Sequence, residues 1–186
     1  MTSFRDTVMD TLLARLKDAC GDSFKYYSRR FWTWEQMLAS RQQGDSPISL
    51  PALFLYDGVG LGGGVDKVEP RGRASPSVIT MKRTIVIYAE YPGTGTPGGP
   101  SSEPGPGSTP FNDLVETILN DGFANDSASQ NACTLSTPDN KAAYPTGLVS
   151  HCWVEGDILY ITPDIDPTGL GMVGIPISVM LYPNSA

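Results

Sequence analysis

The stretch that decides the fold is VITMKRTIVIYAEY, residues 78–91. Successive side chains of a β-strand point to opposite faces, and the odd positions from 79 to 89 are all apolar except Arg83. The even positions carry more polar side chains, among them Thr80 and Lys82. The pattern predicts a long strand with one buried face, and Arg83 indicates that part of the strand projects beyond the core.

A second long strand is predicted near the C-terminus, over residues 172–182. Its odd positions from 173 to 181 are valine, isoleucine or leucine and alternate with smaller or more polar residues. Pro176 lacks a backbone N–H and therefore predicts an edge or a bulge in this strand. Shorter strands are expected over 50–56, 147–155 and 157–162.

Two amphipathic helices complete the predicted core. Apolar residues recur at helical spacing over 4–20, and Gly21 supplies a left-handed stop. A second helix is expected from Thr109 to Gly122, with Pro110 at its first position, and a short helical turn near 35–39. The order of elements predicts an α+β fold, a mixed and mainly antiparallel sheet with two helices packed on one face.

The composition indicates one domain, residues 1–186, with long Gly/Pro-rich loops. The 186 residues include 20 glycines and 16 prolines, and we expect loops over about 57–76 and 92–108. The net charge of −7 argues against a broad basic surface for nucleic acid. No apolar stretch reaches the ~20 residues of a membrane span, and the amphipathic N-terminus with its early Asp6 is not typical of a signal peptide.

The residues that could carry chemistry give no convincing site. The glycines within 58–64 follow a strand but precede no helical pattern, so a dinucleotide loop is disfavoured. His151 is the only histidine, and its neighbour Cys152 should point to the other side of a strand. Asp164 and Asp166 lack the spacing of a calcium loop. We therefore expect no catalytic residue, cofactor or metal, and no enzymatic activity.

An aromatic and basic stretch, residues 24–34, is the best candidate for an interaction surface. Arginine beside tryptophan and tyrosine is typical of the residues that dominate protein–protein interfaces, although such a stretch could also stack on nucleic acid. Our candidate interface residues are two tryptophans and five arginines: Arg29, Arg30, Trp32, Trp34, Arg71, Arg73 and Arg83.

In its order of motifs the chain resembles the tail terminator family of tailed bacteriophages, the proteins similar to minor tail protein U. The motifs run through most of the chain as Ser28-Arg29-Arg30-Phe31, LPALFL (50–55), KRTIVIYA (82–89), FNDLV (111–115), Cys133-Thr134-Leu135, VSHCWVEG (149–156) and GIPISV (174–179). The glycine run at 58–64 and the Gly/Pro tract at 92–108 depart from the family pattern.

The resemblance implies a structural virion protein at the neck, assembled in the host cytoplasm. Family members form a ring, typically a hexamer, that caps the tail tube, stops its polymerisation and offers a surface for joining the head. The implied partners are further copies of the chain, the tail tube protein and a head completion or connector protein, with a sheath protein as a further candidate. DNA would pass through the lumen without specific binding, which suits an acidic chain.

Two alternatives stay open on the sequence. The first is another neck protein, such as a head completion protein or a tail-tube or sheath initiator. The second is of a different class, a small-ligand or nucleotide-binding domain that uses the glycine run.

Overall fold

The computed structural model describes residues 4–44, 46–58, 64–71, 75–90, 109–123, 132–134, 150–161 and 169–181. The helical elements are α1 (Phe4–Cys20), a 3₁₀ turn η1 (Gly21–Ser23), α2 (Trp34–Gln42), α3 (Thr109–Thr117) and a π-helical continuation η2 (Ile118–Gly122). The strands are β1 (Tyr26–Ser28), β2 (Ala52–Tyr56), β3 (Val65–Arg71), β4 (Ser75–Glu90), β5 (Ala132–Thr134), β6 (Ser150–Val154), β7 (Leu159–Ile161) and β8 (Leu170–Leu181).

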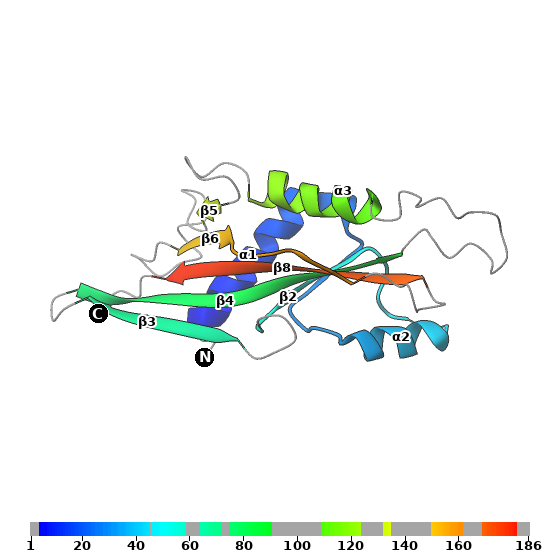
Figure 1. The fold of residues 1–186 in the computed structure, drawn as a ribbon, viewed down its shortest axis with the longest axis horizontal. Coiled ribbons are helices and arrows are strands. Elements are labelled where there is room, and N and C mark those ends of the chain that lie inside the picture. Colours follow the sequence, from blue (N-terminus) through cyan, green and yellow to red (C-terminus); the bar gives the residue numbers. More distant parts are fainter. Residues whose placement is uncertain are drawn as a thin grey trace.

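The two long strands β4 and β8 form the centre of one sheet (Figure 1). They pair antiparallel from Ile79 opposite Leu181 to Glu90 opposite Leu170. On its other side β4 pairs with β3 at one end and with β2 at the other, while β8 pairs with β6 and then with β7. The parallel β1–β2 pair is the exception in an otherwise antiparallel sheet, so the predicted mixed, mainly antiparallel architecture is confirmed.

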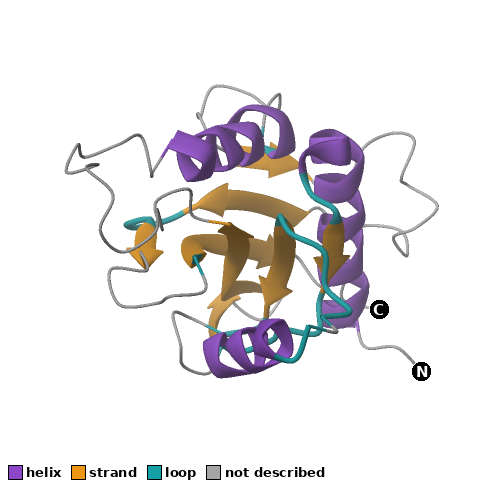
Figure 2. Cartoon of the chain, turned by 90° about the vertical axis from the view of Figure 1, so that its right-hand side faces the viewer, coloured by secondary structure: helices purple, strands orange, loops and turns teal. Residues whose placement is uncertain are grey.

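The helices cover both faces of this sheet (Figure 2). The larger core cluster joins α1, α3 and η2 to the odd-numbered apolar residues of β4 and β8, as expected for two helices on one face. A smaller cluster on the opposite face joins Met37 of α2 to Phe54, Val86 and Tyr88. The short helix near 35–39 was predicted, and it extends over Trp34–Gln42 with a capping box at Thr33.

The expectation of a loop throughout 57–76 is wrong for residues 65–71 and 75–76. Residues 65–71 form β3, which pairs antiparallel with residues 75–82 of β4, from Val65 opposite Lys82 to Arg71 opposite Ser75. The strand has no continuous apolar face because Val65 and Val68 point to opposite sides of the sheet. That mixed pattern hid the strand among glycines and charges. The expected loop at 92–108 lies outside the described residues.

Pro176 lies in the central strand β8 and not at an edge, which corrects the prediction. On one side it is opposite Thr84 of β4. Its carbonyl accepts a hydrogen bond from the Glu155 N–H at 2.9 Å, on the side where β6 has ended and β7 has not begun. The nitrogen and carbonyl of one strand residue face the same side, so the missing N–H faces this gap and breaks no sheet hydrogen bond.

Candidate assembly interface

Arg29, the first of the predicted interface residues, is held inside the chain by three carboxylates. Its guanidinium donates to Asp6 and Asp10 of α1 and to Asp57 after β2, each at 3.0 Å. A further hydrogen bond reaches the Asp6 carbonyl at 3.3 Å. Partial burial lowers the pKa of Arg29, but the hydrogen bonds to Asp10, Asp6 and Asp57 outweigh it and raise the pKa above the usual range.

Arg83 extends the same cluster to the hairpin of β3 and β4. It is 8% exposed, and its Nη2 lies 2.9 Å from Asp66 Oδ1 on β3. Its Nε lies 3.5 Å from Asp57 Oδ1, and its Nη1 donates to the Lys82 carbonyl at 2.8 Å. The other oxygen of Asp66 lies 3.1 Å from Arg5 of α1. This is how the apolar face of β4 accommodates an arginine, because burying a charge requires a partner of opposite sign.

We call these residues the arginine–aspartate cluster: Arg5, Arg29 and Arg83 with Asp6, Asp10, Asp57 and Asp66. It connects α1, the segment after β1, the end of β2, β3 and β4, which are far apart in sequence. The structure places Arg83 inside the chain and not on a free surface, which corrects its assignment as an interface residue. Arg29 is partly exposed, but its ion pairs are also intramolecular.

The aromatic candidates are divided between the second core and the surface. Trp32 and Trp34 are half-buried against the cluster under α2. The Tyr88 hydroxyl donates to the Trp32 carbonyl at 3.0 Å, and the rings of Trp34 and Tyr88 are 6.2 Å apart. Arg30 is exposed and lines a hollow of about 410 Å³ between residues 30–32 and α2. The two tryptophans therefore anchor α2 to the sheet, and Arg30 is the candidate here that faces solvent.

Of the two remaining arginine candidates, Arg71 lies at the end of β3, and Arg73 lies outside the described residues. The backbone of Arg71 is opposite Ser75. The structure therefore brings Arg29 and Arg83 together through Asp57 and sets Arg30, Trp32 and Trp34 apart from them, near α2.

The surface feature that sequence reasoning missed is a pair of open edge strands that each carry exposed apolar side chains. Among the described residues, the exposed large apolar side chains are Val65 and Val68 of β3 (both 53% exposed), Leu159 (55%) and Tyr160 (40%) of β7. Within the described part of the chain, β3 pairs with β4 alone and β7 with β8 alone. The strand 157–162 was predicted, but its exposure depends on the pairing of β8, which the sequence does not reveal.

These two edges lie on opposite sides of the sheet. β3 follows the outer side of β4 along residues 75–82, and β7 follows the outer side of β8 along residues 172–174. An open edge exposes unpaired N–H and C=O groups, which pair readily with another strand. An exposed edge that is also apolar is typical of a contact with another protein.

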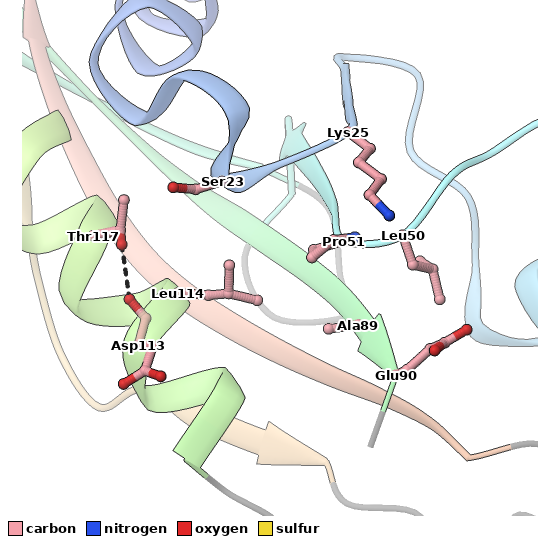
Figure 3. A pocket seen from close by; sticks show the side chains of 9 residues that line it. All are labelled: Ser23, Lys25, Leu50, Pro51, Ala89, Glu90, Asp113, Leu114 and Thr117. Carbon is pink, nitrogen blue, oxygen red and sulfur yellow. Dashed lines mark hydrogen bonds between the residues drawn. The ribbon is translucent and has the colours of Figure 1, made fainter. Parts of the chain in front are cut away.

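A hollow of about 450 Å³ lies between η1, α3 and the ends of β2 and β4 (Figure 3). Its lining residues are Ser23, Lys25, Leu50, Pro51, Ala89, Glu90, Asp113, Leu114 and Thr117. Glu90 is paired with Arg41 at 3.4 Å, and the Thr117 hydroxyl donates to the Asp113 carbonyl at 2.9 Å. One lysine with two carboxylates is a poor match to phosphate, so this hollow gives the nucleotide alternative no support.

The other sequence candidates for chemistry are dispersed. His151 is half-buried on β6, and Cys152 is fully buried on the opposite face, as predicted from strand alternation. No helix begins after the glycine run, because Val65 starts β3. In the ranges that the structure describes, no three His, Cys, Asp or Glu side chains form a possible metal site. Asp164 and Asp166 lie outside those ranges.

Comparison with known proteins finds no family model and no curated sequence that matches this chain. Among the described helices, none is long and apolar enough to cross a membrane.

Proposed function

We propose that this chain is a structural virion protein, a tail terminator that assembles into a ring on the end of a phage tail tube. The ring stops tube polymerisation and offers its other side to the head completion or connector protein. In this role the protein acts by shape and docking and transforms no substrate.

The observation that carries the proposal is the pair of open edges, each with exposed apolar side chains, on opposite sides of one sheet. A ring of identical subunits needs heterologous contacts, in which one patch meets a different patch of the neighbour. The edge of β3, where Val65 and Val68 are exposed, and the edge of β7, where Leu159 and Tyr160 are exposed, are two such surfaces.

The charge of the chain supports the same role. A net charge of −7 opposes phosphate binding, which suits a lumen through which DNA must slide. The described arginines of the cluster are neutralised by aspartates and leave no concentrated basic surface there. A basic lumen in the assembled ring would contradict this part of the proposal.

The function is tested with the full chain and the tail tube protein of the same virus. Native mass measurement should give a closed ring, alone or on tube ends, and addition of the chain should stop tube growth in a polymerisation assay. A chain that binds only head-side components would favour the other neck proteins. A chain that stays monomeric with and without tubes, and leaves tube growth unchanged, would contradict the terminator function.

A further inference from the structure

We propose that the subunits join through their sheets, with β3 of one copy pairing antiparallel with β7 of the next. This inference rests on the proposed function, since it specifies which surfaces form the ring. The occupant of each open edge is a second copy of this chain, so this chain supplies both halves of the contact.

The direction of the strands fits this pairing. β3 is antiparallel to β4, β4 is antiparallel to β8, and β8 is antiparallel to β7. β3 and β7 consequently run in opposite directions within one chain. Two copies placed side by side in nearly the same orientation, as in a ring, then present an antiparallel pair of edges. Pairing β3 with β3 would instead need a twofold axis and would give a closed dimer.

The faces of the two strands also agree. Residues directly opposite each other on neighbouring strands share a face, so Val65 and Lys67 lie on the face of Lys82 and Thr80, toward α2. Leu159 is opposite Gly174, on the face of Met172, which also packs toward α2. A sheet that continues from one copy to the next keeps these faces aligned only in registers that set odd residues opposite odd residues.

One of those registers sets one apolar pair and one pair of opposite charges across the contact. When Val65 is opposite Leu159, the antiparallel direction would set Lys67 opposite Asp157, which lies two residues before the first residue of β7, if the pairing extends that far. The two apolar side chains are each more than half exposed in the single chain and would cover one another. Lys67 and Asp157 are both exposed and of opposite charge. In the single chain Lys67 pairs with Glu69 of its own strand at 2.6 Å, and Asp157 of the next copy would add a second carboxylate beside it.

A charge exchange tests this register. Lys67→Asp or Asp157→Lys alone sets like charges opposite each other and should raise the apparent dissociation constant of the ring by about tenfold or more. The double variant Lys67→Asp/Asp157→Lys restores an opposite pair between copies but not the pair of Lys67 with Glu69. Its apparent dissociation constant should therefore fall by about tenfold from that of the Lys67→Asp single variant. Lys25→Asp, the same substitution at an exposed lysine outside both edges, is the control and should leave assembly unchanged. Circular dichroism checks that each variant is folded.

Cross-linking tests the contact itself. In a Cys133→Ser background, the remaining native cysteines, Cys20 and Cys152, are buried. A mixture of the Val65→Cys chain and the Leu159→Cys chain should form a disulfide-linked dimer under mild oxidation, whereas either chain alone should not. Each measurement is made on the chain alone and with tail tubes present.

The outcomes separate the two proposals. A ring that forms without the mixed disulfide, or that is indifferent to the charge exchange, overturns the edge pairing and leaves the terminator function standing. A disulfide in the Val65→Cys chain alone overturns it too, because that link requires β3 beside β3. A folded chain that never assembles, even on tubes, overturns both.

Discussion

Replacing Arg83 by methionine should destabilise the fold, although the substitution keeps a long aliphatic side chain on the apolar face of β4. The substitution removes the guanidinium, which lies 2.9 Å from Asp66 and 3.5 Å from Asp57 and donates to the Lys82 carbonyl at 2.8 Å. Methionine fills part of the space and restores none of these polar contacts. Asp66, whose side chain is 23% exposed, then keeps Arg5 alone as its partner at 3.1 Å.

The size of the effect follows from the burial of the pair. Removing one partner of a fully buried ion pair costs about 3–5 kcal/mol, because it leaves the other charge uncompensated. Asp66 is partly exposed and keeps Arg5, and Asp57 keeps Arg29. We therefore expect a loss of about 2 kcal/mol, below that range but above the ~0.5 kcal/mol of an ordinary surface change.

Urea unfolding of the full chain measures this loss. With a slope of about 2 kcal/mol per molar urea, typical of a small domain, the midpoint should fall by about 1 M. Arg30→Met is the matched control, since Arg30 is exposed and its substitution should shift the midpoint by less than about 0.3 M. If Arg83→Met and Arg30→Met unfold at the same urea concentration, the cluster does not stabilise the fold and the reasoning is refuted.

Three further perturbations follow from the described contacts. Gly122→Ala should lower the free energy of unfolding by about 1–2 kcal/mol, because the new Cβ would lie 2.7 Å from Leu16 Cδ2. The control is Gly174→Ala, whose new Cβ would lie at an ordinary 3.6 Å from the Thr84 side chain. The urea midpoints of the two variants measure the difference. Burial, and to a lesser extent the charge of Asp121, raises the pKa of Cys20 to about 11, and Cys152 is also buried. Both thiols of a Cys133→Ser chain should therefore resist a thiol reagent near pH 8 until the chain is unfolded. Hydrogen bonds from Ser178 and Lys82 lower the pKa of Glu155 below its ordinary value. The original chain should therefore have a higher free energy of unfolding than Glu155→Gln at about pH 7, and this difference should vanish as the pH falls through the lowered pKa. A difference that stays constant down to about pH 3 would contradict the prediction.

The sequence was sufficient for the elements whose side chains obey one period over many residues. The alternation in β4 and β8 predicted both strands, and the helical spacing over 4–20 predicted α1. β3 was missed because both of its faces are partly exposed, so no apolar alternation marks it. Pro176 was predicted at an edge or a bulge, because only the pairing pattern reveals that it lies in a central strand beside a gap between β6 and β7.

The roles of the arginines could not be predicted from their types. Arg29 and Arg83 look alike in sequence to the exposed Arg30, and their partners Asp6, Asp57 and Asp66 are brought to them only by the fold. An arginine beside aromatic residues is therefore as consistent with an internal ion pair as with an interface. The open edges of β3 and β7 could not be predicted from the sequence for the same reason, since the exposure of Leu159 depends on which strand lies next to β8.

The arginine–aspartate cluster and the proposed subunit contact meet on one strand. Asp66 faces Arg83 and Arg5 from one face of β3, and its neighbours Val65 and Lys67 point to the other face. The next copy would pair along the outer edge of the same strand. An edge strand is ordered in advance when its inner side chains are fixed, and a pre-ordered edge loses less conformational entropy on binding. Loss of Arg83 should then weaken assembly indirectly, by loosening β3. That effect differs from a lost contact, because reversing the charges at Lys67 and Asp157 together would not repair it.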